Sequence, residues 1–279
     1  MVCLRCCRFS YVAKLQGASV AGDRRAPELA DGLLFDSVAD AYEEARPGYP
    51  AALYEVLSEL VPPPANVLEL GAGTGQATIE LARRGYRVSA IEPGARMAAA
   101  LEAKLSPYEC RVWRGRFEEW PADPQVDMVV AATSLHWVEL ETAADRLAAA
   151  LRPGGLLAPF WVRFASLPRY EQALNRIYER STHGDRPRNH TVNVLSALSD
   201  SGRFTALPSH EFTEERPYAA DGWVRLVGTF SETLAMSSGE RSWFLGAIRE
   251  VIDREFGGII IKRLIVTLHP FRVAAASLR

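Results

Sequence analysis

Three glycines that follow a short apolar stretch are the residues of this sequence best suited to bind a ligand. The stretch 67–70 contains one carboxylate, Glu69, and Gly71, Gly73 and Gly75 alternate with small residues before a helical pattern begins. Glycine lets the backbone turn sharply and approach a ligand closely. A strand, a glycine turn and a helix N-terminus together present unpaired N–H groups and the positive end of a helix dipole. We therefore expect this turn to hold a cofactor.

A second carboxylate and one missing glycine narrow the class of cofactor. The dinucleotide fingerprint has its third glycine where this sequence has Gln76. Glu92 ends the next predicted strand, where a carboxylate can take both ribose hydroxyls in either class of adenosine cofactor. The combination favours a cofactor other than a dinucleotide. An NAD-dependent dehydrogenase remains an alternative that would need the third glycine and a hydride-transfer site.

The elements that must position these residues alternate between strand and helix patterns. Strands are predicted over residues 67–70, 87–91, 110–113, 127–132 and 156–162, and helices over 75–84, 95–105 and 140–151. Such alternation predicts an α/β fold, a parallel sheet with helices on both faces. Ligands bind such sheets beyond the carboxyl ends of the strands, where the strand order reverses.

The flanking segments divide the chain into parts with different expected roles. Further helices are predicted near 35–46 and over 51–60, 168–180, 192–200, 220–234 and 242–256, with strands over 204–218 and 259–273. We expect a disordered extension at 1–33 and one domain over 34–279. Within that domain the expected parts are a helical cap (34–63), the core (64–162), a variable substrate insertion (163–202) and C-terminal strands and helices (203–279).

Composition excludes several classes of partner. The chain has 279 residues, a formal net charge of −2 and a pI near 6.3, so it has no bulk attraction to nucleic acid or to anionic membranes. No apolar run approaches the roughly 20 residues that span a bilayer. We expect neither nucleic acid nor membrane as a partner, and a monomer or a homodimer.

The cysteines and the first residues bear on compartment. Cys3, Cys6 and Cys7 crowd the N-terminus and Cys110 stands alone, which favours a reducing, cytoplasmic setting over a disulfide framework. A structural zinc site needs four ligands, so we expect no metal. The first 22 residues are basic and lack acids. We interpret them as a disordered extension or a misplaced start, with an organellar targeting segment as the alternative.

The sequence combines the pattern Glu69-x-Gly71-x-Gly73-x-Gly75 with Glu92 and with the Leu-Arg-Pro-Gly-Gly sequence at 151–155. In these features it resembles the S-adenosylmethionine-dependent methyltransferases. That resemblance implies a Rossmann-like sheet of seven mostly parallel strands whose last strand is antiparallel. The aromatic and Arg-Pro pattern of residues 35–50 is similar to the cap of the small-molecule subgroup that contains trans-aconitate and quinone-pathway methyltransferases. The implied activity is methyl transfer from S-adenosylmethionine to a small molecule, with a non-catalytic cofactor-binding relative as the alternative.

The resemblance also implies the residues that hold the cofactor. They are Glu69, Gly71, Gly73, Thr74, Gly75, Gln76, Glu92, Pro93, Met97, Phe117, Glu118, Ala131 and Thr133. The sequence departs from the family at Arg116, where relatives often carry an acid that faces the adenine amino group. We expect Phe117, Glu118 or backbone groups to take over adenine recognition.

The acceptor side is predicted from the cap and from the segment after the fourth strand. His136 is the candidate general base because its unperturbed pKa lies near neutrality, and the alternative is a histidine that only orients the substrate. Trp137 is a candidate to face the cationic sulfonium. The expected acceptor-binding residues are Tyr42, Arg46, Tyr49, Trp137, Trp161 and Tyr170. For the three cap residues among them, packing of the cap onto the core is the alternative.

Overall fold

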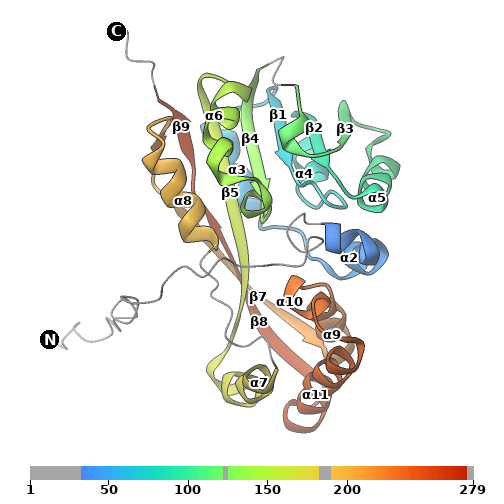
Figure 1. Cartoon of the computed structure of the whole chain (residues 1–279). Coiled ribbons are helices and arrows are strands. Elements are labelled where there is room, and N and C mark those ends of the chain that lie inside the picture. The colour runs from blue at the N-terminus through green and yellow to red at the C-terminus, as the bar shows by residue number, and fades with distance from the viewer. Residues whose placement is uncertain (1–32, 122–124, 182–189, 275–279) are drawn as a thin grey trace, which may run out of the picture.

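The computed structural model describes residues 33–121, 125–181 and 190–274 (Figure 1). Its strands form one sheet in the order β3-β2-β1-β4-β5-β8-β7, with β6 and β9 paired beside this path. The strands are β1 (Asn66–Leu70), β2 (Arg87–Glu92), β3 (Cys110–Arg114), β4 (Val126–Ala132), β5 (Leu151–Ser166), β6 (Phe204–Ala206), β7 (His210–Ala219), β8 (Ile259–Leu268) and β9 (Phe271–Val273). Strands β1 to β5 are parallel, whereas β8 and β7 are antiparallel to their neighbours. The predicted Rossmann-like α/β fold is thereby confirmed.

Helices cover both faces of the parallel part because its strands are apolar on both sides. Val67 packs with α3 and α4 on one face, and Leu68, its neighbour in β1, packs with α6 and α8 on the other. Leu101 brings α5 onto β2 at Ala90. These helices are α3 (Ala51–Leu60), α4 (Thr78–Arg83), α5 (Ala95–Leu105), α6 (Leu140–Ala150) and α8 (His190–Asp200).

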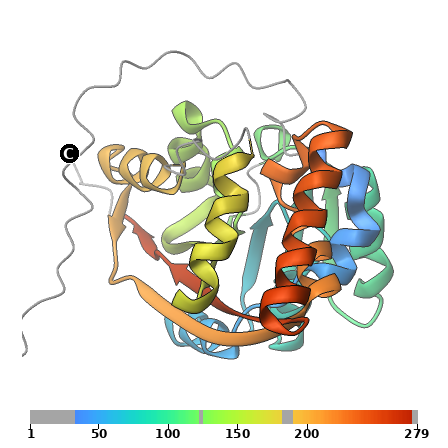
Figure 2. The same cartoon turned by 90° about the horizontal axis from the view of Figure 1, so that it is seen from below.

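A second group of helices covers the part of the sheet that extends past the parallel strands. Strands β5, β7 and β8 continue below β1 to β4 in Figure 1, where Trp223, Phe244 and Ile248 form the centre of a separate apolar cluster. Seen from below, α7 and α11 lie side by side across this extension (Figure 2). We call this part the lower lobe: α7 (Pro168–Arg180), α9 (Ala220–Gly228), α10 (Ser231–Leu234), α11 (Ser238–Phe256) and the extended ends of β5, β7 and β8.

The cap lies between the parallel sheet and the lower lobe. It begins with the 3-10 helix η1 (Leu33–Val38) and α2 (Ala39–Ala45), which contact α5 on one side and α9 and α10 on the other. Two more 3-10 helices, η2 (Phe117–Glu119) and η3 (Leu135–Trp137), follow β3 and β4. The cap therefore stands at the carboxyl ends of the parallel strands, where a ligand is expected.

Four predicted boundaries were wrong. The helix predicted over 220–234 is two helices, and at the break Thr229 Oγ1 donates to the Leu226 carbonyl at 2.7 Å. The strand predicted over 259–273 is interrupted by His269 and Pro270, because proline has no N–H for the ladder. The fifth strand, predicted to end at residue 162, runs to Ser166. The helix predicted over 75–84 starts only at Thr78, because the glycine turn occupies the residues before it.

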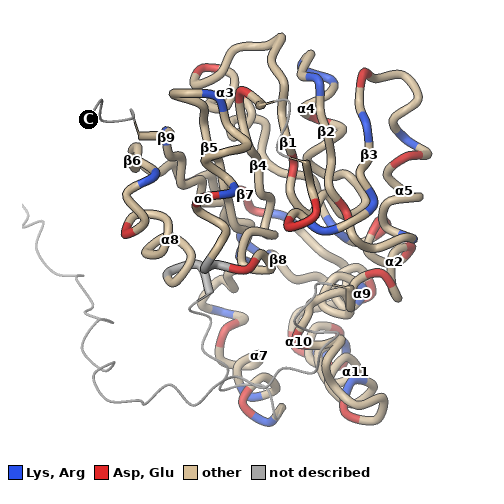
Figure 3. Tube along the Cα trace, turned by 45° about the horizontal axis from the view of Figure 1, so that its top comes forward, with Lys and Arg blue, Asp and Glu red and all other residues tan. Residues whose placement is uncertain are grey.

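The charges on the surface are of both signs, as the formal net charge of −2 leads us to expect. Acidic and basic residues are mixed along the tube of Figure 3, and exposed side chains such as those of Arg87 and Glu109 form ion pairs. Across the part of the chain that the structure describes, no helix is long and apolar enough to cross a membrane. The extension expected at 1–33 lies outside the described residues except for Leu33.

Candidate functional site

The glycine turn joins β1 to α4 by a backbone path that side chains would obstruct. Gly71 and Gly75 have φ angles of +63° and +98°, a region that residues with a Cβ rarely adopt. A Cβ on Gly71 would lie 2.7 Å from the Cβ of Ser134, and one on Gly75 would overlap the Leu101 side chain. The turn can therefore lie close against both β4 and α5 only with glycine at these two positions.

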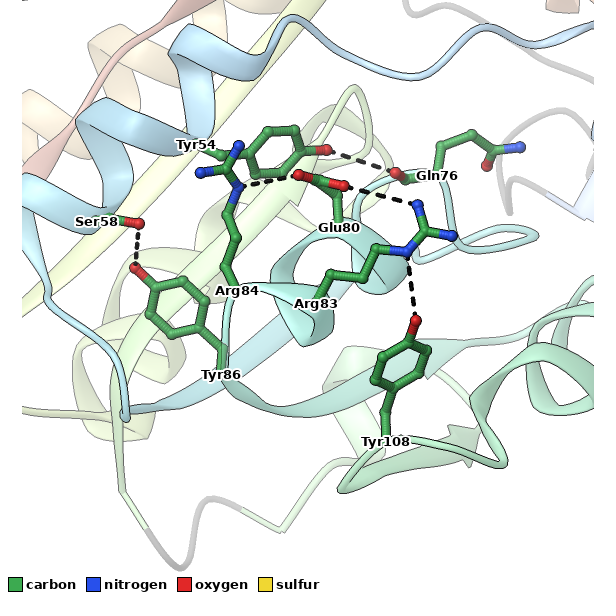
Figure 4. A network of polar contacts seen from close by, with 8 residues as sticks. All are labelled: Tyr54, Ser58, Gln76, Glu80, Arg83, Arg84, Tyr86 and Tyr108. Carbon is green, nitrogen blue, oxygen red and sulfur yellow. Dashed lines mark hydrogen bonds and ion pairs between the residues drawn. The ribbon is translucent and has the colours of Figure 1, made fainter.

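The far side of the turn is fixed by side chains that the sequence reading did not single out (Figure 4). Tyr54 of α3 donates to the carbonyl of Gln76 at 3.4 Å, and Arg84 donates to Glu80 at 3.0 Å. The side chain of Gln76 turns back and donates to Thr74 Oγ1 at 2.8 Å. Thr74 and Gln76 thus shape the turn itself.

Glu92 connects the end of β2 to the glycine turn. Its Oε2 accepts from the N–H of Gly73 and its Oε1 from the N–H of Gly94, both at 2.8 Å. Burial raises the pKa of this carboxyl, and the two backbone donors lower it in part. Each carboxylate oxygen can accept more than one hydrogen bond, so Glu92 can still take ribose hydroxyls beside the turn.

Asp36 is a site residue that the sequence reading missed. Its Oδ1 accepts from the N–H groups of Arg96 and Met97, at 2.7 and 3.0 Å, and so occupies the N-terminus of α5. A carboxylate is stabilised there by the free N–H groups and the helix dipole. Its charge lies close enough to raise the pKa of Glu92. The partners lie about 60 residues apart in the chain, so no local pattern pointed to the contact.

Glu69 lies beneath the turn with its side chain buried. It is 1% exposed and accepts a hydrogen bond from Thr78 Oγ1 at 2.6 Å. Burial raises its pKa to about 8, against an ordinary value of 4.5. The hydrogen bond joins β1 to the first turn of α4, so Glu69 holds the two ends of the glycine turn together.

Thr133, directly after β4, is strained and has an unused polar atom. Its φ is +57°, the only positive value among the described residues other than glycine. Its N–H donates to the Phe160 carbonyl at 2.7 Å, but its buried hydroxyl has no hydrogen-bond partner in the described structure. Strain of this kind costs about 1–3 kcal/mol and concentrates at functional sites. Thr133 therefore marks the position where a bound group is expected.

A small hollow of about 20 Å³ lies beside Thr133, between the cap and the lower lobe. It is lined by Tyr42, Arg46, Pro47, Gly48, Tyr49, Gln76, Thr133, Val162, Phe164 and Leu264. The predicted cap residues Tyr42, Arg46 and Tyr49 are thus brought together next to the glycine turn. Desolvation raises the pKa of the Tyr49 phenol, which keeps it protonated.

Arg46 fastens the cap to the lower lobe and also faces this hollow. Its Nε and Nη2 donate to the hydroxyl and carbonyl of Thr229, at 2.9 and 2.8 Å. Its guanidinium lies over the rings of Tyr42 and Phe230, at 4.7 and 4.9 Å. In the described structure Arg46 has no carboxylate partner, so its charge is met only by neutral groups and ring faces.

His136, the predicted general base, is held by a hydrogen bond from the fifth strand that favours the alternative role of orienting the substrate. Trp161 Nε1 donates to its Nδ1 at 3.2 Å. A neutral imidazole that accepts at Nδ1 carries its proton on Nε2. Neither nitrogen then has a free lone pair to take a proton from an acceptor. The ring is instead arranged as a hydrogen-bond donor, and Trp161 acts by orienting it.

The remaining predicted residues lie in the cap, near α5 and η2, and at the end of β2. Trp137 lies at the cap, with its ring 6.0 Å from that of Phe35. Met97 and Phe117 are buried at the start of α5 and in η2, and Glu118 accepts from the N–H of Glu139 at 3.2 Å. Pro93 lies between the two residues whose hydrogen bond closes the end of β2.

Tyr170 and Ala131 do not line the hollow. Tyr170 is 3% exposed and packs against Phe256 in the lower lobe, with ring centroids 4.7 Å apart. Tyr170 follows an apolar stripe on α7, and that stripe faces α11. Ala131 is fully buried in the core beside α6 and does not line the hollow, and its predicted place at the methionine end of the cofactor stays a prediction. The packing of Tyr170 in the lower lobe contradicts its predicted role in acceptor binding.

The described residues contain no group of three or more His, Cys, Asp or Glu side chains placed to hold a metal ion. The thiol of Cys110, half-buried in β3, has its pKa raised by burial. Cys3, Cys6 and Cys7 lie outside the described residues.

Comparison with known proteins gives this arrangement a family context. Residues 67–155 match a methyltransferase domain family. An uncharacterized methyltransferase of Mycobacterium tuberculosis is 41% identical over 131 residues, which cover 46% of this chain and 52% of the relative. The chain thus spans about half the length of this curated relative.

Solved structures share the fold at low sequence identity. A protein described as a type II methyltransferase from Anaeromyxobacter dehalogenans has a TM-score of 0.62 and 22% identity, covering 82% of this chain and 99% of that one. A Haemonchus contortus N-methyltransferase complex with S-adenosylhomocysteine has a TM-score of 0.50 and 13% identity, covering 88% of this chain and 60% of that one. Residues 67–155 are thus similar to a methyltransferase domain, and the solved structures share the fold of the chain.

Proposed function

We propose that this chain is an S-adenosylmethionine-dependent methyltransferase that acts on a small-molecule acceptor. The observation that carries the proposal is the junction of Glu92 with the glycine turn. This carboxylate, at the end of β2, accepts from Gly73 and Gly94, and the glycine turn that it holds follows β1, beside the reversal of strand order between β1 and β4. An adenosine cofactor needs a ribose-binding carboxylate next to such a turn.

The residues present fit that cofactor. A Cβ at Gly71 would fill the turn, and the Thr133 hydroxyl is buried without a partner in the described structure. Glu92 would hold the ribose, the backbone of residues 71–75 the methionine part, and Met97 and Phe117 the adenine. When bound, S-adenosylmethionine supplies an electrophilic methyl group on a sulfonium. We also propose that the chain belongs to the subgroup that contains trans-aconitate and quinone-pathway methyltransferases. The sequence pattern of the cap is the only support for this assignment.

The protein's own residues contribute positioning and exclusion of water. The cap covers the glycine turn, with Tyr42 near Gly73 and η1 fastened to α5 through Asp36. Holding two reactants in line and without water contributes about 7–11 kcal/mol in favourable cases. His136, oriented by Trp161, would donate from Nε2 to the acceptor. Tyr49 and Thr133 would orient the reacting group at the hollow.

The proposal is tested by binding and then by turnover. Titration with S-adenosylhomocysteine and with NAD, followed by calorimetry, should show saturable binding of the first and none of the second. Binding of NAD alone would overturn the proposal in favour of a dehydrogenase. Incubation of cell-extract metabolites with labelled S-adenosylmethionine should then transfer label to a small molecule. Tight S-adenosylhomocysteine binding with no transfer would support a non-catalytic relative instead.

A further inference from the structure

A buried lysine in the lower lobe has no role in the site described so far. Lys262 of β8 is 3% exposed, and its Nζ donates to Ser166 Oγ at 2.6 Å. The ammonium lies over the ring of Trp223 at 4.5 Å. In the part of the chain that the structure describes, no carboxylate lies within ion-pair distance of Lys262. Glu171, which is exposed on α7, acts on it only from farther away.

This environment favours an additional partner for the lysine. A charge removed from water without a counter-ion is costly, and an aromatic face and one hydroxyl offset only part of that cost. Burial lowers the pKa of Lys262 to about 8. An ammonium has three donors, and one is used by Ser166. Trp223 Nε1, fully buried in the ring that faces the ammonium, also has no hydrogen-bond partner among the described residues.

The Lys262 ammonium and the Trp223 indole N–H are both hydrogen-bond donors, so a negatively charged hydrogen-bond acceptor would satisfy both. A carboxylate offers two oxygens, one for the ammonium and one for the indole N–H. A neutral amide would satisfy the hydrogen bonds without balancing the charge. The pair therefore selects for an acid.

The lysine lies directly beyond the wall of the acceptor hollow. Phe164 and Leu264 line the hollow and are paired across β5 and β8, and the next pair on the same face is Ser166 with Lys262. One such step along a strand is roughly 7 Å. The Phe164 ring lies 5.6 Å from Trp223 and 5.9 Å from Phe230, so this half-buried side chain separates the hollow from the lysine.

We propose that Lys262 and Trp223 Nε1 bind a carboxylate of the methyl acceptor, at the end of the acceptor remote from the methylated atom, and that the half-buried Phe164 side chain turns aside to admit it. The proposal rests on the proposed function and deepens it by naming the substrate class. The acceptor is an acid with an apolar middle that packs on Phe164 and Leu264. Its carboxylate is a recognition group, and the methylated group lies at Thr133. Arg46, which also has no carboxylate partner in the described structure, adds positive potential at the same hollow.

The test compares acids with their primary amides on the protein saturated with S-adenosylhomocysteine. The probes are hexanoate, decanoate, 4-phenylbutyrate and the three corresponding amides, titrated by calorimetry at pH 7. The unmodified protein should bind at least one acid tenfold or more tightly than its amide. Lys262→Met should remove that preference and leave the amide affinity unchanged. Trp223→Phe, which keeps a ring but removes the N–H, should weaken acid binding severalfold.

The matched control is Arg263→Met, because Arg263 is the next residue of β8, is exposed and pairs with Glu215 at 3.1 Å. This variant should bind the acids as the unmodified protein does. Lys262→Met is expected to fold, since it replaces a buried charge without a carboxylate partner by an apolar side chain of similar length. Equal affinity for acids and amides, or a preference that survives Lys262→Met, would overturn the inference. Failure to bind S-adenosylhomocysteine would instead contradict the proposed function.

Discussion

Trp161 donates its indole N–H to Nδ1 of His136, with 3.2 Å between the two nitrogens. The donor comes from β5 and the acceptor from η3, so the bond connects two segments that meet only in the folded protein. It determines which ring nitrogen carries the proton and therefore what His136 can do. The two residues act as one unit, and Trp161 is the positioning residue of the pair.

This relationship predicts how substitutions of His136 will behave. His136→Gln keeps a donor and should hold kcat/KM within about fivefold, whereas His136→Ala should lose about tenfold, close to the contribution of one hydrogen bond. A general base would contribute about 100-fold or more. Turnover and its pH profile are measured with S-adenosylmethionine and the identified acceptor. Loss of about 100-fold in His136→Gln, with loss of one limb of the pH profile, would restore the base role.

Glu92→Ala should weaken S-adenosylhomocysteine binding by about 1–3 kcal/mol, because the ribose hydroxyls lose a charged acceptor. The measurement is the dissociation constant from calorimetry. Glu102→Ala is the control, since Glu102 is an exposed acid of α5 that pairs with Arg114. Unchanged affinity in a folded Glu92→Ala protein would contradict the ribose assignment.

Glu69→Gln should alter the dependence of stability on pH. The folded protein holds a proton on Glu69 up to a pKa of about 8, whereas the unfolded chain releases it near 4.5. Between these values the folded state binds more protons, so this group's contribution to stability is complete below pH 4.5 and is lost as pH rises to 8. Relative to Glu69→Gln, the unmodified protein should lose up to about 4 kcal/mol over this range.

The measurement is urea unfolding of both proteins between pH 4.5 and 8, with Glu109→Gln as a control because Glu109 is exposed beside Arg87. The difference between the unmodified protein and Glu69→Gln should grow with pH. A difference that stays constant across the range would show that Glu69 is ionised in the folded state.

Gly75→Ala and Gly154→Ala separate backbone strain from steric overlap. Both glycines have positive φ, +98° and +71°, so both variants should lose about 1 kcal/mol from strain. At Gly75 the new Cβ also overlaps Leu101, whereas nothing lies within 4 Å at Gly154. The free energy of unfolding of Gly75→Ala should therefore fall by a further ~1–3 kcal/mol, because the added methyl group overpacks the site. Urea unfolding gives both values, and equal losses would contradict the role assigned to Leu101.

The sequence predicted the parts of this molecule that depend on local chemistry. The apolar strands, the glycine turn and Glu92 were located correctly because strand period, glycine spacing and a terminal carboxylate are all readable from neighbouring residues. Asp36 at the N-terminus of α5 and the pairing of Trp161 with His136 were not predicted. Each joins residues that are distant in the chain, so only the folded backbone brings them together.

Tyr170, in contrast, was predicted to bind the acceptor but lies away from the hollow. An aromatic residue soon after the fifth strand suggested an acceptor pocket, but β5 continues to Ser166 and carries α7 past the hollow. The same extension brings Phe164 into the hollow and places Ser166 beside Lys262. Neither arrangement is visible before the length of β5 and its register with β8 are known.

Strand β5 runs without interruption from the parallel sheet into the lower lobe. The family match ends at residue 155, before β5 leaves the parallel sheet, and Phe160 on the same strand supports Thr133 through its carbonyl. The bond that strains Thr133 therefore lies on the same strand as the base of the lower lobe, but does not depend on that lobe's helices. If the proposed function holds, exchanging the lower lobe after Phe160, with the Arg46–Thr229 contact retained, should change the acceptor while the cofactor site persists.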